Sequence, residues 1–113
     1  NSAKILILGV SFKEDCPDIR NTKVIDIIDE LIEYNCKVNI YDPWVNPEEA
    51  KKEDGINLLK NVPINYYDGI IIAVSHKIFK KMGIQKIRSF GKNKNAVYDL
   101  KHLFPMEAVD KRL

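Results

Sequence analysis

Short, uninterrupted apolar runs are the feature that most limits how this chain can fold. The clearest are residues 5–8, which read Ile-Leu-Ile-Leu, and residues 70–74, which read Ile-Ile-Ile-Ala-Val. A run without alternating polar residues suits a strand whose two faces are both covered, as in a parallel sheet. Segments with helical spacing separate these runs, and that alternation is typical of an α/β domain.

A helix is predicted after the first strand and the polar loop that follows it. Apolar residues recur at helical spacing from Val24 to Leu31, and acidic residues occupy the opposite side. Asn21 or Thr22 can cap the start of this helix, because either side chain can accept a hydrogen bond from the first turn. Asn35 can end it, because asparagine tolerates the left-handed conformation that often follows a helix.

The rest of the chain continues the alternation of strands and helices. Strands are predicted at 37–41, 67–74 and 96–99, with a weak one at 56–59, and short helices at 48–53, 77–81 and 84–90. No internal repeat, low-complexity stretch or linker interrupts the pattern, so we expect one domain over residues 1–113. The predicted fold class is α/β: a three-layer Rossmann-like domain with a parallel, doubly wound five- or six-stranded sheet.

Composition excludes several classes of protein. A chain of 113 residues, 45% of them hydrophobic, is large enough for one core. The net charge of +2 argues against a nucleic-acid binder, and no apolar run approaches the roughly 18–20 residues that span a membrane. No secretory signal pattern opens the chain, and Cys16 and Cys36 form no Cys-x-x-Cys pair. We therefore expect reduced thiols, no metal site and a cytoplasmic location.

The carboxyl edge of the predicted sheet is the expected ligand site. Doubly wound sheets bind ligands beyond the carboxyl ends of their strands, where the strand order reverses. Three segments should gather there: residues 10–20, 75–76 and 99–104. Their basic side chains are Lys13, Arg20, His76, Lys101 and His102. Such a cationic cluster in a nearly neutral chain predicts an anionic ligand, which a helix N-terminus near Thr22 would also attract.

The first loop carries a resemblance to a known family. It reads Gly-Val-Ser-Phe-Lys-Glu-Asp-Cys-Pro-Asp-Ile-Arg-Asn-Thr-Lys from Gly9 to Lys23. This resembles the opening of the UDP-binding domain in the UDP-glucose/GDP-mannose dehydrogenase family. Further matching segments are VNIYDPWV at 38–45, YDGIIIAV at 67–74 and VYDLKHLF at 97–104. The segment Cys-Pro-Asp-Ile-Arg-Asn-Thr at 16–22 resembles the corresponding segment of one branch of the family. That branch oxidises UDP-N-acetylhexosamines for bacterial surface polysaccharides and includes Vi-antigen-type enzymes.

The resemblance implies an oxidoreductase of which this chain is one part. The family oxidises the sugar C6 alcohol to a carboxylate in two steps, with two NAD⁺ and a cysteine nucleophile. That cysteine lies in a Gly-Gly-His-Cys-type motif before the UDP-binding domain, and neither this motif nor Gly-x-Gly-x-x-Gly occurs here. Residues 1–113 are therefore expected to be the C-terminal UDP-sugar-binding domain of a larger dehydrogenase, without turnover alone. NAD would bind mainly to a separate N-terminal domain, beside a central domain, in a homodimer or larger parent.

Site residues follow from the resemblance position by position. Phe12 and Lys13 match the Phe-Lys pair that contacts the nucleotide sugar, where a lysine can donate charge-assisted hydrogen bonds to pyrophosphate. Arg20 matches an arginine that reaches NAD across the domain interface. Lys101 matches a basic residue, often arginine, that also touches substrate, although a lysine lacks the bidentate geometry. No catalytic residue and no metal ligand is assigned to this chain.

Structural explanations compete with each of these roles. Lys13 can be a solvated loop lysine, and Arg20 can pair with Asp15 or Asp18 to hold the loop. Cys16 does not match the family's catalytic cysteine, so a packing role is favoured over a nucleophile. His76 and His102 are interpreted as loop or capping residues. Asp42 is interpreted as a turn residue rather than a ribose ligand, and Trp44 as packing on other domains rather than stacking on a base.

Two other classes of function remain as alternatives. One is a stand-alone flavodoxin-like nucleotide-binding or regulatory module, such as a receiver or a small regulatory nucleotide binder. A receiver needs an acidic cluster after the first strand and an aspartate that ends the third. Glu14 and Asp15 lie in the first loop, but no phosphoacceptor follows. An independent dinucleotide-binding domain needs glycines that admit a pyrophosphate, whereas Gly9 is followed by Val-Ser-Phe-Lys.

Overall fold

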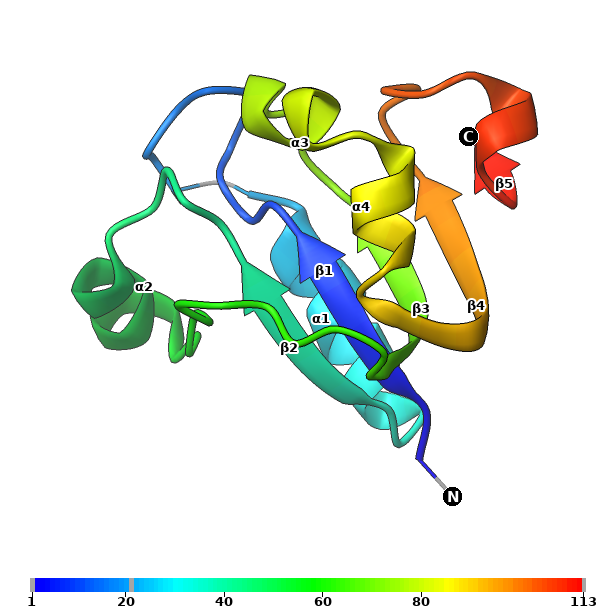
Figure 1. The fold of residues 1–113 in the computed structure, drawn as a ribbon. Coiled ribbons are helices and arrows are strands. Elements are labelled where there is room, and N and C mark those ends of the chain that lie inside the picture. The colour runs from blue at the N-terminus through cyan, green and yellow to red at the C-terminus, as the bar shows by residue number, and fades with distance from the viewer. Residues whose placement is uncertain (1, 21, 113) are drawn as a thin grey trace.

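A parallel sheet forms the centre of the molecule (Figure 1). The computed structural model describes residues 2–20 and 22–112. Within them the strands are β1 (Lys4–Leu8), β2 (Lys37–Tyr41), β3 (Tyr67–Ile72), β4 (Gly91–Asp99) and β5 (Lys111–Arg112). Their order is β2-β1-β3-β4-β5, and every neighbouring pair runs parallel. The predicted parallel α/β fold is confirmed.

Helices cover both faces of the sheet and make three layers. They are α1 (Val24–Glu33), α2 (Pro47–Asp54), α3 (Lys77–Met82) and α4 (Ile84–Arg88), with a short 3₁₀ turn at Met106–Ala108. In Figure 1, α1 lies behind the sheet and α4 lies in front of it. Ile7 packs with Ile28 of α1 in one core, whereas Leu6 packs with Phe79 and Ile87 in the other. Both faces of β1 are therefore buried, which explains its continuous apolar sequence.

The strand order reverses between β1 and β3. The chain leaves β1, passes through α1 and returns as β2 on one side. It later returns to the opposite side of β1 as β3, and β4 and β5 extend the sheet outward from there. The two halves of the chain therefore diverge at the carboxyl ends of β1 and β3. Ligands of doubly wound sheets bind at this kind of point.

The end of α1 matches its predicted signal, whereas its N-cap residue is Lys23, which makes no side-chain cap hydrogen bond. The Thr22 hydroxyl accepts a hydrogen bond from the Val24 amide at 3.2 Å, although Lys23 is the residue directly before the helix. Asn21, the alternative cap, lies outside the described residues. Asn35 has a φ of 67°, so it does adopt the left-handed conformation that ends the helix.

Three predicted elements differ from the structure. The weak strand at 56–59 is reduced to one bridge between Ile40 and Leu58, because only the Leu59 amide bonds back to β2. The strand predicted at 67–74 ends at Ile72 as β3. β4 begins at Gly91 instead of residue 96, and its added residues are mostly exposed and polar. The two-residue strand β5 carries no apolar run and was not predicted.

Candidate functional site

A hollow of about 430 Å³ opens at the point where the strand order reverses. We call it the main hollow. Its lining residues are Ser11, Phe12, Lys13, Glu14, Thr22, Lys23, Val24, Ala73, Val74, Ser75 and Lys101. All three segments predicted to gather at this edge contribute, since the list includes residues that follow β1, β3 and β4. The volume lies in the range of small-molecule sites.

Gly9 allows the first loop to leave β1 at this edge. Its φ is +96°, a conformation that other residues rarely adopt. A Cβ atom at this position would lie 2.5 Å from the Val74 Cβ, far inside van der Waals contact. The loop after β1 therefore passes directly against the segment after β3. A side chain at position 9 would separate the two segments that line the main hollow.

Lysines dominate the charge of the main hollow. Lys13, Lys23 and Lys101 all line it and are exposed. The Glu14 carboxylate also lines it and accepts a hydrogen bond from the Ser75 hydroxyl at 2.7 Å. The first residue of α1, Val24, contributes a helix N-terminus, whose partial positive charge favours anions. The predicted meeting of Lys13 and Lys101 is confirmed, and the site suits an anion.

The turn after β4 brings Lys101 to the hollow. Buried Asp99 accepts hydrogen bonds from the Lys101 amide at 3.2 Å and the Phe104 amide at 2.8 Å. These bonds close a tight turn in which His102 has a φ of 55°. His102 is exposed and does not line the main hollow. The prediction that it joins the cationic cluster is therefore wrong.

His76 does not belong to a surface cationic cluster either. Its side chain is fully buried beneath the first loop. Its Nδ1 accepts a hydrogen bond from the Asp15 amide at 2.8 Å, and its Nε2 lies 3.0 Å from the Asp42 carboxylate. The interpretation of His76 as a loop residue fits this geometry, and the expectation of an exposed cation was wrong because the loop folds over the ring.

Asp42 forms the turn that was expected at this position. Its Oδ1 accepts a hydrogen bond from the Trp44 amide at 2.8 Å, which is the pattern of an Asx turn. Burial raises the pKa of Asp42, but hydrogen bonds from His76 and from the Val10 amide outweigh it and hold the pKa below its usual value. The Asp42 side chain is fully buried, so it does not offer a free oxygen to a ribose.

Arg20 lies in a second hollow, away from the Lys13–Lys101 pair. This Arg20 hollow is lined by Pro17, Asp18, Ile19, Arg20, Glu49 and Glu53. The guanidinium binds Asp18 through Nε and Nη2, both at 3.1 Å, which confirms the predicted structural pairing. The hydrogen bonds from the Arg20 side chain lower the pKa of Asp18 below its usual value. The expectation that Arg20 joins the other cations is wrong, because residues 16–20 turn toward α2.

Neither cysteine nor tryptophan lines the main hollow. Cys16 and Cys36 are free and half-buried. Trp44 is 44% exposed and stacks on His76, with ring centroids 6.1 Å apart. Within residues 2–20 and 22–112, no group of His, Cys, Asp and Glu side chains has the arrangement of a metal site. No helix in this part of the chain is long and apolar enough to cross a bilayer.

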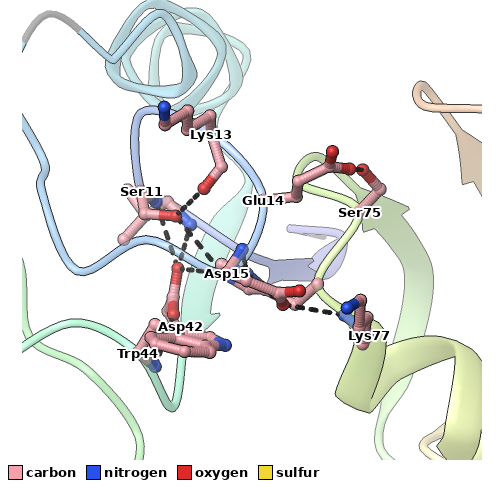
Figure 2. Close-up of polar contacts among 10 residues, drawn as sticks. Ser11, Lys13, Glu14, Asp15, Asp42, Trp44, Ser75 and Lys77 are labelled. Carbon is pink, nitrogen blue, oxygen red and sulfur yellow. Dashed lines mark hydrogen bonds and ion pairs between the residues drawn. The ribbon is translucent and has the colours of Figure 1, made fainter.

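Two features of the site were not identified from the sequence. Lys23 lines the main hollow, and its only signal was its place at the end of the matched loop. The buried Asp42–His76 pair joins the ends of two different strands, and Figure 2 shows Asp42 below Ser11. In the sequence, Asp42 and His76 each follow an apolar run closely, but this pattern does not show that the two side chains meet.

Comparison with known proteins gives consistent results. A model of the "UDP-glucose/GDP-mannose dehydrogenase family, UDP binding domain" matches residues 6–106. A UDP-N-acetyl-D-glucosamine 6-dehydrogenase of Salmonella typhi is 53% identical over 111 residues, which cover 98% of this chain and 26% of that protein. One from Pseudomonas aeruginosa is 49% identical over 113 residues, covering 100% and 27%. The chain thus spans about a quarter of the length of these curated relatives.

Solved structures agree on the fold. A UDP-D-ManNAc dehydrogenase from Pyrococcus horikoshii superposes with a TM-score of 0.75 at 22% identity, over 98% of this chain and 25% of that one. A UDP-glucose dehydrogenase from Pyrobaculum islandicum gives 0.74 at 17% identity, over 99% and 25%. At these identities the likeness bears on the architecture alone, which it supports over nearly the whole chain.

Proposed function

Since this chain belongs to the UDP-glucose/GDP-mannose dehydrogenase family as its UDP binding domain, we propose that it binds a UDP-sugar for a larger NAD-dependent 6-dehydrogenase. The observation that carries the proposal is the meeting of Phe12, Lys13 and Lys101 in one hollow. These are the residues that the family resemblance assigns to substrate, and they come from the ends of two different strands.

The chemistry of the main hollow suits a nucleoside diphosphate. Lys13, Lys23 and Lys101 can donate charge-assisted hydrogen bonds to the pyrophosphate, each stronger than a bond between neutral groups. Phe12 is 54% exposed at the rim, so its ring is available to pack on the uracil or the sugar. In the proposed complex, the ligand would cover the Phe12 ring and remove it from water. The lysines together with the Phe12 ring therefore favour a ligand that carries an anionic group beside an apolar or aromatic group.

The sugar is proposed to be an N-acetylhexosamine. The support is the wording of residues 16–22 together with two relatives at about half identity, both named as UDP-N-acetyl-D-glucosamine 6-dehydrogenases. In this proposal the product is the corresponding uronic acid, for polysaccharide synthesis in the cytoplasm. Other domains of the parent supply the nucleophilic cysteine and the rest of the sugar pocket, and two or more copies of the parent assemble.

NAD is assigned a single contact in this chain. When bound, NAD⁺ accepts the hydride that leaves the sugar C6. Arg20 is the proposed contact, and its guanidinium side chain is 78% exposed. It would have to exchange Asp18 for the pyrophosphate, which costs little because exposed ion pairs contribute only about 0–1 kcal/mol. Glu49 and Glu53 line the same hollow, so this chain alone is expected to bind NAD⁺ weakly.

Titration of the ¹⁵N-labelled chain tests the proposal. UDP, UDP-N-acetylglucosamine and NAD⁺ are added separately while amide shifts are followed by NMR. Shifts at Phe12, Lys13 and Lys101 with both UDP compounds, and weak ones with NAD⁺, are expected. Strong shifts of the loop after Gly9 with NAD⁺, while UDP has no effect, would overturn the proposal in favour of an independent dinucleotide-binding domain. No shift with any of them would favour a regulatory module.

A further inference from the structure

A buried polar network lies under the loop that lines the main hollow. Asp42 follows β2 and His76 follows β3, and both side chains are fully buried. Neither residue lines the main hollow. A buried pair of this kind often stabilises a protein no more than apolar residues of the same volume would. Because the pair lies under the loop, its effect is expected on the geometry of the loop more than on the stability of the fold.

Asp42 holds the beginning of the loop and His76 holds its end. The Asp42 Oδ2 atom accepts hydrogen bonds from the Val10 amide at 2.8 Å and the Ser11 amide at 3.1 Å. The His76 Nδ1 atom accepts one from the Asp15 amide at 2.8 Å. Asp42 and His76 are themselves 3.0 Å apart. Figure 2 shows Asp42 below Ser11, with Asp15 on the right of Asp42.

The residues between these two attachments are the ones that line the hollow. Phe12, Lys13 and Glu14 form the tip of the loop, and all three line the main hollow. The tip is braced further, because the Ser11 hydroxyl donates to the Lys13 carbonyl at 2.9 Å. The Phe12 amide donates to the Asp18 carbonyl at 2.7 Å. These hydrogen bonds restrain the backbone of the tip at both ends and in the middle.

The hydrogen bonds specify one tautomer of His76. The Asp15 amide is a donor, so Nδ1 must present its lone pair and the ring hydrogen must lie on Nε2. At Nε2 it faces the Asp42 carboxylate and the Ser11 hydroxyl oxygen, which is 3.2 Å away. The hydrogen of Ser11 is already directed at the Lys13 carbonyl. A hydrogen on Nδ1 would place two donors face to face and release Asp15.

We propose that Asp42 and His76 are positioning residues for the nucleotide-sugar site: together they fix the loop tip so that Phe12 and Lys13 face the ligand before it binds. This inference rests on the proposed function of the main hollow. A loop that is already ordered loses less conformational entropy on binding, so affinity rises without any new contact to the ligand. The pair acts only through the loop backbone and does not touch the ligand.

Variants of His76 separate positioning from packing. His76→Phe retains a ring against Trp44 and Phe79, which the imidazole contacts, but lacks both nitrogen atoms. We expect its affinity for UDP to fall about tenfold, because the hydrogen bond from the Asp15 amide is lost. His76→Asn places an amide oxygen where Nδ1 was, so it can still accept from Asp15. It should bind UDP within about threefold of the unchanged chain. Ile87→Val, in the core on the α4 side, is the control for general loss of stability.

The tautomer gives a readout that does not depend on ligand or on any variant. The chain has two histidines, so a long-range ¹H–¹⁵N spectrum shows buried His76 beside exposed His102 as an internal reference. At neutral pH we expect His76 to carry its hydrogen on Nε2 alone and His102 to show a mixture. A hydrogen on Nδ1 of His76 would overturn the inference, and this holds even where His76→Phe fails to fold.

The outcomes distinguish this inference from the proposed function. If the unchanged chain binds no UDP, the proposed function fails, and the tautomer and the Asp15 amide exchange rate still decide whether the pair holds the loop. If the chain binds UDP and His76→Phe binds it equally well, the positioning role is wrong although the hollow is correctly assigned. Faster exchange at Asp15 with tenfold weaker binding in His76→Phe, rescued in His76→Asn, supports both.

Discussion

The two halves of the loop between β1 and α1 are held in opposite ways. Residues 10–15 are bonded to the buried Asp42–His76 pair. In residues 16–20, Ile19 packs in the core and the Asp18 carbonyl accepts a hydrogen bond from the Phe12 amide. The side chains of Arg20 and Asp18 form an ion pair and are 78% and 35% exposed. Water and salt weaken exposed pairs but have little access to buried ones. The first half is therefore fixed, whereas Arg20 in the second half can exchange its partner.

This difference fits what each half is proposed to contact. Lys13 is proposed to contact the nucleotide part of the ligand from this chain, where a fixed backbone increases affinity. Arg20 is assigned to NAD, most of whose site belongs to another domain, and a side chain that can move adapts to a partner arriving from outside. The different surroundings of Lys13 and Arg20 thus fit the different roles proposed for them.

Asp42→Ala is expected to give the largest effect and to test the fixed half directly. The substitution leaves the Val10, Ser11 and Trp44 amides and the His76 ring without their shared acceptor. Breaking a buried pair in this way costs about 3–5 kcal/mol of unfolding free energy, measurable by urea denaturation. Asp18→Ala is the matched control in the other half and should leave the unfolding free energy unchanged. Equal effects of the two substitutions would remove the contrast between the halves.

Lys13→Ala and Lys101→Ala are expected to give the next largest effect, on binding rather than on folding. Each removes a charge-assisted hydrogen bond to pyrophosphate, worth about 1.5–3 kcal/mol. The dissociation constant for UDP, from NMR titration, should therefore rise about 10- to 100-fold. Lys60→Ala removes an exposed lysine outside the main hollow and should have no effect. A similar loss in Lys60→Ala would mean that the cations act only through net charge.

Most of the fold could be predicted from the sequence, because apolar runs report burial on both faces. The strand at 37–41 was predicted to the residue, and those at 5–8 and 67–74 to within two residues. The first half of β4 could not be, because residues 92–94 are exposed and polar and fall in a break of the register between the Tyr67–Gly91 and Gly69–Ala96 pairs. β5 is too short to carry a periodic pattern.

The site was predictable where a motif assigns the residue and not where tertiary contacts decide. Lys13 and Lys101 lie together because both follow strands that end at the same edge. The burial of His76 depends on the path of the loop above it, which no local pattern encodes. Arg20 was expected beside the other cations, but Asp18 draws its side chain toward α2. Asp42 and His76 bind the backbone of a loop that is distant in the sequence, and such contacts produce no periodic pattern that a sequence analysis can detect.

Acid should weaken the fixed half through Asp42, by a smaller amount. Its pKa is below the usual value in the folded chain, so the unfolded chain binds more protons and stability rises with pH. The contribution is fully present above the unfolded pKa of about 3.9 and is lost as the pH falls through the lower folded pKa. Unfolding free energy measured from pH 2 to 6 should depend less steeply on pH in Asp42→Asn. An unchanged slope would show that the pKa of Asp42 is the same in the folded and the unfolded chain, and a steeper slope would show that Asp42 stays protonated in the folded chain.

Arg20→Gln should have the smallest effect, and that result is informative. The substitution breaks the pair with Asp18 but leaves the main hollow intact, so the dissociation constant for UDP and the unfolding free energy of this chain should stay roughly unchanged. The same NMR titration and urea denaturation measure both. If UDP binding instead falls as far as in Lys13→Ala, Arg20 reaches the nucleotide sugar and the two halves of the loop serve one site. If binding holds, a role for Arg20 requires a ligand held by another domain, because nothing bound by this chain alone depends on it.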